Sequence, residues 1–271
     1  MKPKKSKIKH IKIKSSFRYP NIKESDRVFG QALTIPILRE DGDWRTFLPP
    51  EEEQNKRGIE SSACYIEGQQ HTIATLLEEK FGIIDDNYSA RFNALLSNGT
   101  EGGGDPLAGA YSINHDGLIP DSMMPFGDDI QSWEDFHSWK GVSEYACRKQ
   151  GKDYLAKWKM NYKIEIEREM PLETKYTLLR AALKKSPIPI SVFAWIENGG
   201  FYVKPQGARD NHMVEAVFVD EQNRIYVRDT YAPFEKILEP NYNFEFGISW
   251  TISKKPKRKS WLDIIKDFFK F

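Results

Sequence analysis

Two side chains in this sequence, a thiol and an imidazole, have the chemistry needed for nucleophilic catalysis. Cys64 stands at the start of a helix predicted over residues 63–80. The unpaired N–H groups and the dipole at a helix start favour a thiolate, which is the nucleophilic form of cysteine. A cysteine at a helix start can equally be a small buried residue, so its position alone does not decide its role.

His212 is predicted to lie beside a carboxylate. It opens a predicted strand over residues 213–219, and Asp229 follows the next predicted strand, over residues 224–228. Because antiparallel strands joined by a short turn are neighbours, Asp229 can accept a hydrogen bond from the imidazole and stabilise its protonated form. Taken singly, the two residues can also be a polar strand-end histidine and a turn carboxylate.

Other chemistries lack their sequence signatures. The sequence contains no His-Glu-x-x-His motif, no phosphate-binding loop of the Gly-x-x-x-x-Gly-Lys type and no Gly-x-Ser-x-Gly motif. The five histidines are scattered without ligand spacing, and two cysteines cannot form a four-cysteine zinc site. We therefore expect no metal and no cofactor. Cys147, in a polar helical stretch, is interpreted as a bystander.

Composition limits the class of protein. The chain has 271 residues, of which 39% are hydrophobic, and 40 basic residues nearly balance 39 acidic ones. These values are typical of a soluble globular protein with one large domain or two lobes. No run of 18 apolar residues and no apolar stretch after the Lys-rich start is present, which predicts neither a transmembrane segment nor a signal peptide. We expect a cytoplasmic or virion-associated protein in a reducing compartment.

The predicted elements segregate along the chain. Ser61 and Ser62 are candidate N-caps of the first helix, and Gly82 is expected to end it. Helices are predicted over residues 63–80, 88–97, 107–114, 133–162 and 171–185, and strands over residues 188–196, 213–219, 224–228 and 245–253. Helices followed by antiparallel strands indicate an α+β protein with two lobes.

Charge divides the chain differently. Residues 1–23 carry a net charge of +9 and residues 254–271 carry +5, so the overall charge of +1 leaves −13 on residues 24–253. The first segment is predicted to be a solvated, disordered arm, and the last a basic amphipathic helix. We expect these ends to bind the acidic body or an anionic partner, namely nucleic acid or a membrane surface.

Segments between residues 45 and 253 match known motifs in a fixed order, namely Gln54, Ser62-Ala63-Cys64-Tyr65, Gly103-Gly104-Asp105-Pro106, Pro189-Ile190-Ser191-Val192, Gly199-Gly200-Phe201-Tyr202, Asn211-His212-Met213-Val214 and Arg228-Asp229-Thr230-Tyr231. In this order they resemble the papain-like cysteine peptidases, and specifically the compact members without disulfides found in microbes and their viruses. The 148-residue separation of Cys64 and His212 agrees with this family.

The resemblance implies a fold and a domain organisation. A helical N-terminal lobe, at about residues 55–185, would face a C-terminal lobe built as an antiparallel β-sheet or barrel, at about residues 186–253. Together they would form a peptidase domain over residues 45–253. Residues 1–44 would be a basic arm with an extended lead-in, and residues 254–271 the C-terminal helix.

The resemblance also implies the site. Cys64 would be the nucleophile, His212 its acid and base, Asp229 the residue that orients His212, and Gln54 a donor to the oxyanion. An extended polypeptide substrate would bind at a second set of residues, namely Gly103, Gly104, Asn211 and Tyr231. The expected activity is cysteine endopeptidase.

Three features depart from the family pattern: a longer spacing between Gln54 and Cys64, an Asp at position 229 in place of Asn, and Tyr231 in place of Trp. One alternative is a transglutaminase-like domain or another Cys-His-Asp acyl transferase, because His212-x-x-Glu215 and Val227-x-Asp229-Thr230 also fit that pattern. Another alternative is a non-catalytic binding or virion component on the same scaffold.

Overall fold

Helices dominate the first part of the chain and strands the second. The structure, a computed structural model, describes residues 17–23, 28–29, 36–84 and 87–256. Its α-helices are α1 (Cys64–Phe81), α2 (Ala90–Leu96), α3 (Pro106–Asp116), α4 (Trp133–Phe136), α5 (Glu144–Lys157) and α6 (Leu172–Leu183). Short 3₁₀ turns occur at Arg45–Phe47 and Asp121–Met123.

A seven-stranded sheet forms the other half of the fold, with the order β1-β4-β11-β5-β8-β9-β10. Its strands are β1 (Val28–Phe29), β4 (Trp158–Ile166), β5 (Ile188–Val192), β8 (His212–Val219), β9 (Ile225–Arg228), β10 (Glu235–Ile237) and β11 (Gly247–Lys254), and every neighbouring pair is antiparallel. Two hairpins stand apart, β2 (Asn55–Lys56) with β3 (Ile59–Glu60) and β6 (Glu197–Asn198) with β7 (Phe201–Tyr202). The predicted α+β class is confirmed.

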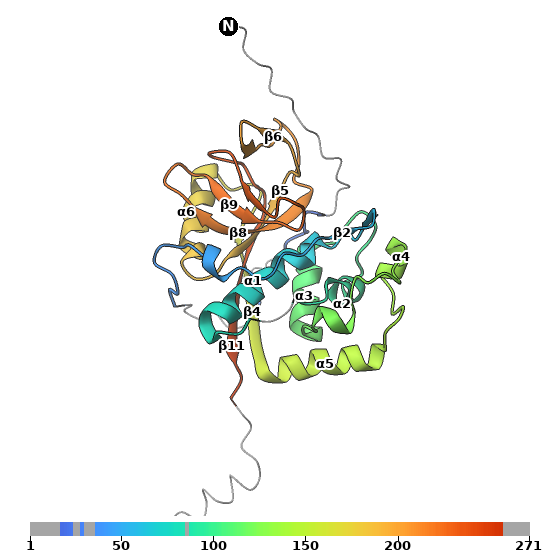
Figure 1. Cartoon of the computed structure of the whole chain (residues 1–271). Coiled ribbons are helices and arrows are strands. Elements are labelled where there is room, and N and C mark those ends of the chain that lie inside the picture. Colours follow the sequence, from blue (N-terminus) through green and yellow to red (C-terminus); the bar gives the residue numbers. More distant parts are fainter. Residues whose placement is uncertain (1–16, 24–27, 30–35, 85–86, 257–271) are drawn as a thin grey trace, which may run out of the picture.

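Helix α1 lies between the two halves, with α2 to α5 on one side and the sheet with α6 on the other (Figure 1). Its approach to β8 is close, because a Cβ on Gly68 would lie 3.3 Å from Met213 Cγ. Gly82 ends the helix in the left-handed conformation, with φ of 63°, as predicted. The buried side chains around α1 belong to one large hydrophobic cluster that spans both halves.

The predicted helix over residues 133–162 is wrong in two places: it is interrupted between α4 and α5, over residues 137–143, and it ends at residue 157. Residues 158–166 form strand β4, in which buried side chains at every second position alternate with more exposed ones. This period of two is the pattern of a strand with one face on a core, and the strand pairs along its length with β11. The strand belongs to the sheet although it comes from the stretch expected in the helical lobe.

The chain ends are only partly described. The solvated arm predicted for residues 1–23 is wrong for its last part, because Phe17 is 3% exposed and Pro20 is also buried. The Lys-rich residues 1–16 and the predicted C-terminal helix lie outside the described residues, except for residues 254–256.

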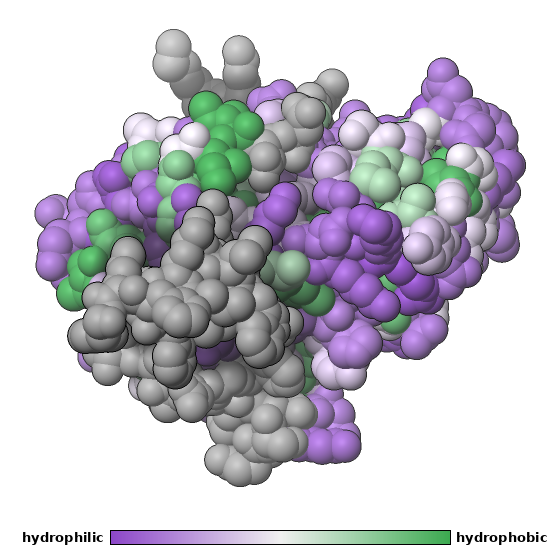
Figure 2. Space-filling model, turned by 90° about the horizontal axis from the view of Figure 1, so that it is seen from below, coloured by the Kyte–Doolittle hydropathy of each residue, from purple (hydrophilic) through white to green (hydrophobic). Residues whose placement is uncertain are grey.

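No helix within the described ranges has both the length and the apolar character to cross a membrane. Viewed from below, the described surface of the helical half, where α5 lies in Figure 1, is mostly hydrophilic (Figure 2). Helix α5 accordingly buries few residues, which are Cys147, Gly151 and Tyr154.

Candidate active site

Cys64 is the first residue of α1 and is fully buried. The predicted serine N-caps are wrong, because the cap residue is Ala63, which makes no side-chain capping bond. Ser62 instead adopts a φ of 57°, and its hydroxyl donates to the Glu101 carbonyl at 2.8 Å. This contact brings the turn before the helix against the loop that contains Gly102, Gly103 and Gly104.

His212 and Asp229 meet as the strand prediction required. His212 is the first residue of β8, Asp229 follows the end of β9, and the two strands pair antiparallel. The distance from His212 Nε2 to Asp229 Oδ1 is 2.6 Å, and both side chains are fully buried. The carboxylate therefore holds one ring nitrogen and fixes the orientation of the imidazole.

Electrostatics at His212 favour the protonated ring. Burial alone would lower the pKa of His212, but the charges of Asp229 and Cys64, together with the hydrogen bond to Asp229, raise it to about 10. Burial alone would raise the pKa of Asp229, but His212 and Lys236 together lower it. The thiol, the imidazole and the carboxylate thus form one connected group.

Lys236, which was not predicted from the sequence, is a second partner of Asp229. Its Nζ lies 2.6 Å from Asp229 Oδ2 and also donates to the carbonyls of Tyr231 and Pro233. Burial lowers the pKa of Lys236, although Asp229 opposes this. No sequence signal identifies such a lysine, because a lysine on a short strand is ordinarily an exposed residue.

Gln54 is fully buried in a network of short hydrogen bonds. Its Nε2 donates to Glu60 Oε1 and to Tyr231 Oη, each at 2.6 Å, and its Oε1 accepts from Thr230 Oγ1 at 2.7 Å. The ring of Tyr231 lies 5.2 Å from that of His212. The network therefore connects Gln54 to the loop that carries Asp229.

Gly103 and Gly104 lie in different surroundings. The backbone N–H and C=O of Gly103 both bond Thr100 in a turn. At Gly104 a Cβ would lie 2.1 Å from Tyr65 Cζ, so only glycine fits against that ring. The Gly104 carbonyl accepts from the backbone N–H of Arg18 at 3.1 Å.

Residues 17 and 18 run along the positions that were predicted to bind substrate. Phe17 N donates to the Asn211 carbonyl at 3.1 Å, and Phe17 forms a parallel bridge with Gly104. Two backbone acceptors, at Gly104 and Asn211, are thus occupied by an extended segment of the chain itself. This contact was not predicted from the sequence.

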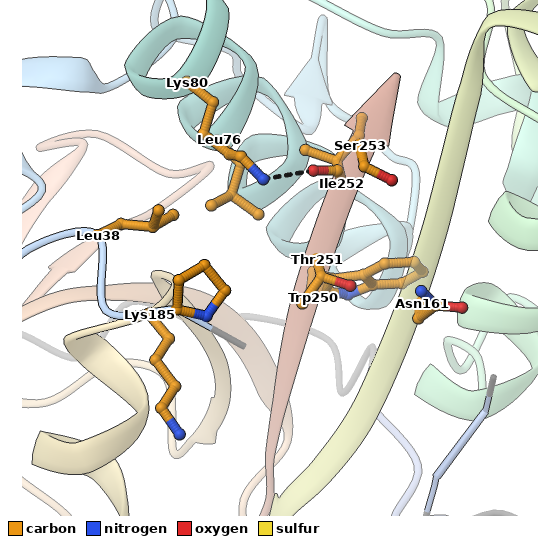
Figure 3. Close-up of a pocket in the computed structure, with 10 residues that line it drawn as sticks. Leu38, Leu76, Lys80, Asn161, Lys185, Trp250, Thr251, Ile252 and Ser253 are labelled. Atoms are coloured by element: carbon orange, nitrogen blue, oxygen red, sulfur yellow. Dashed lines mark hydrogen bonds between the residues drawn. The ribbon is translucent and has the colours of Figure 1, made fainter. Parts of the chain in front are cut away.

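A separate apolar cavity, of about 180 Å³, lies between the end of α1 and strand β11 (Figure 3). Leu76, Trp250 and Ile252 line it, and Lys80 Nζ donates to the Ile252 carbonyl at 2.6 Å. None of the predicted site residues lines this cavity. It is therefore distinct from the group around Cys64.

Comparison with known proteins identifies the fold. No protein-family model matches the sequence, and no curated protein matches it. Among solved structures, xylellain, a cysteine protease from Xylella fastidiosa, is 16% identical with a TM-score of 0.57, over 92% of this chain and 100% of that one. Digestive procathepsin L 3 of Tenebrio molitor is 16% identical with a TM-score of 0.54, over 83% and 76%.

The bromelain protease from Ananas comosus, solved in complex with the E64 inhibitor, is also 16% identical, with a TM-score of 0.51 over 77% of this chain and 97% of that one. These proteins share one fold with this chain despite their low sequence identity. The chain therefore has the fold of the papain-like cysteine proteases.

Proposed function

We propose that the protein is a cysteine endopeptidase that hydrolyses peptide bonds through Cys64. The observation that carries this proposal is the buried series of Cys64, His212 and Asp229, in which the imidazole interacts with the thiol on one side and the carboxylate on the other. Such a series supplies a nucleophile, a proton carrier and a group that orients the carrier. The fold agrees with this chemistry, since the solved proteins that share it include proteases.

The reaction would proceed in two halves. The Cys64 thiolate attacks the carbonyl carbon of the scissile bond, and protonated His212 gives its proton to the leaving amine as the C–N bond breaks. Water then attacks the thioester, His212 takes a proton from that water, and the C–S bond breaks to release the acid. Asp229 keeps the ring in position throughout.

The oxyanion of each tetrahedral intermediate needs hydrogen-bond donors. We assign this role to the backbone N–H of Cys64 and the side-chain amide of Gln54. Removing one such donor ordinarily costs ~10²–10³-fold in rate. The position of Gln54 in a network with Tyr231, whose ring neighbours His212, supports this assignment.

An extended polypeptide is the proposed substrate. The carbonyls of Gly104 and Asn211 already accept hydrogen bonds from consecutive backbone N–H groups of residues 17 and 18. A peptide in extended conformation offers the same donors, so it can replace this segment. Asn211 and Tyr231 adjoin His212 in this arrangement and complete the proposed binding region.

Peptide hydrolysis by purified Cys64→Ala protein tests the proposal. We expect a loss of at least ~10³-fold, since the other groups cannot form the acyl intermediate without the thiol. Cys147→Ala is the matched control and is expected to retain wild-type rates. Equal activity in the wild type and Cys64→Ala would contradict the proposal.

A further inference from the structure

We propose that Glu60 is a positioning residue that holds the Gln54 amide at the oxyanion site, an inference that rests on the proposed function. Glu60 accepts three hydrogen bonds, from Gln54 Nε2 at 2.6 Å, Tyr231 Oη at 2.6 Å and the Ser62 backbone N–H at 3.0 Å. A carboxylate has room for about four such donors. Glu60 therefore connects three segments that meet beside Cys64.

The unusual spacing before Cys64 explains how Glu60 reaches Gln54. Residues 55–60 form the hairpin of β2 and β3, in which Asn55 pairs with Glu60. Its turn contains Arg57 and Gly58, both with positive φ. The additional residues thus return the chain to Gln54 and place a carboxylate next to its amide.

The charge of Glu60 decides which way the Gln54 amide faces. A carboxylate only accepts hydrogen bonds, so the nitrogen of the amide must face it, and the oxygen then receives the Thr230 hydroxyl. Burial and the adjacent Glu60 charge raise the pKa of Tyr231. The phenol therefore stays protonated and donates a hydrogen bond to Glu60. The amide plane is held at three points.

Both N–H groups of Gln54 are occupied in this state, one by Glu60 and one by Tyr231. A hydrogen bond to a carboxylate is roughly twice as strong as one to a neutral hydroxyl. The bond to Tyr231 is therefore the one that yields to a developing oxyanion, while Glu60 keeps the amide in place. In this proposal Glu60 acts on the reaction only through the Gln54 amide.

The test compares Glu60→Ala with Glu53→Ala, a control that removes an exposed carboxylate next to Gln54 in the sequence. We expect Glu60→Ala to lower kcat about 10-fold with little change in KM. Misplacing a group at an active site can reduce the rate ~10²-fold, and a Gln54 amide that is mobile but still present should lose only part of that. In the Gln54→Ala background the same change should cost nothing further. Multiplied losses in the double variant would overturn the proposal, since Glu60 would then act independently of Gln54.

A conservative variant covers the case in which Glu60→Ala does not fold. In Glu60→Gln the new carboxamide oxygen can still accept from Gln54 and Ser62, so kcat should recover to within about 3-fold of the wild type, in line with the modest worth of one hydrogen bond. A Glu60→Gln protein that folds but is as slow as Gln54→Ala would contradict the proposal.

A measurement that does not depend on catalysis distinguishes this inference from the proposed function. The two side-chain amide protons of Gln54 should be resolved and slow to exchange by NMR in both the wild type and Cys64→Ala, and should broaden or exchange rapidly in the Glu60 variants. Unchanged amide protons in Glu60→Ala would overturn the role of Glu60. Hydrolysis that does not depend on Cys64 would overturn the proposed function alone, and the amide spectrum would still decide whether Glu60 holds Gln54.

Discussion

The two cysteines are buried to the same extent but lie in opposite electrostatic surroundings. Cys64 is 0% exposed and Cys147 is 1% exposed. Cys64 begins a helix and interacts with the His212 ring, whereas Cys147 packs among Phe92, Ile119 and Met124 in a small apolar cluster. Burial raises the pKa of Cys147, with Arg91 opposing only in part. Charged neighbours, rather than burial, therefore distinguish the two thiols, and the proposed function requires Cys64 to be the reactive one.

The largest expected effect comes from removing the partner of Cys64. In His212→Ala we expect peptide hydrolysis to fall by ~10³-fold or more, since removing one member of a catalytic triad is that costly. Alkylation of Cys64 by iodoacetamide should slow in the same variant, while Cys147 stays unreactive in both proteins. Equal labelling rates of the two thiols in the wild type would contradict the proposed difference in reactivity between Cys64 and Cys147.

The next effect is on stability and tests the charges behind His212. Asp229→Asn leaves Lys236 buried without its counter-charge, and removing one partner of a buried ion pair costs ~3–5 kcal/mol. We expect a clear fall in the denaturant midpoint, recovered in part by adding Lys236→Met. If the double variant is no more stable than Asp229→Asn, the unpaired charge of Lys236 is not the source of the lost stability.

A smaller effect is expected where residues 17 and 18 lie on Gly104 and Asn211. Arg18→Pro removes the N–H that bonds the Gly104 carbonyl, and a backbone hydrogen bond contributes ~0.5–1.5 kcal/mol. We expect Cys64 to react with iodoacetamide about 3-fold faster, and peptides to be cleaved faster, without change at Cys147. Arg18→Ala keeps the N–H and serves as control; the same acceleration in both variants would assign the effect to the side chain.

A further effect concerns pH. The pKa of His212 is about 10 in the folded protein and ~6.5 in an unfolded chain, so its contribution to stability is complete below pH ~6.5 and is lost as pH rises through about 10. The wild-type Tm should therefore fall more steeply between pH 7 and 10 than that of His212→Gln. Parallel curves for the two proteins would contradict the raised pKa.

Local signals in the sequence were sufficient for much of the candidate site. The start of α1 at Cys64 and the pairing of β8 with β9 followed from periodicity and a short turn. Asp229 beside His212 was a consequence of that pairing. Strand β4 was missed because it follows α5 without a break, and its first residues, 158–162, were assigned to the preceding polar helix.

The remaining features have no local signal. The spacing between Gln54 and Cys64 indicated an insertion, but strands of two residues show no periodicity, so neither the hairpin nor the contact of Glu60 with Gln54 could be predicted. Lys236 has the sequence context of an exposed residue, and it lies beside Asp229 only because β10 pairs with β9.

The sequence by itself determined the chemistry available and the elements that carry it, because side-chain type, helix periodicity and short turns act over a few residues. Only the tertiary structure decided which distant groups meet. Gln54 bonds Tyr231 across 177 positions, and the N–H groups of residues 17 and 18 reach Asn211 and Gly104. Backbone donors and acceptors are the same in nearly every residue, so their partners depend on packing and cannot be read from residue type.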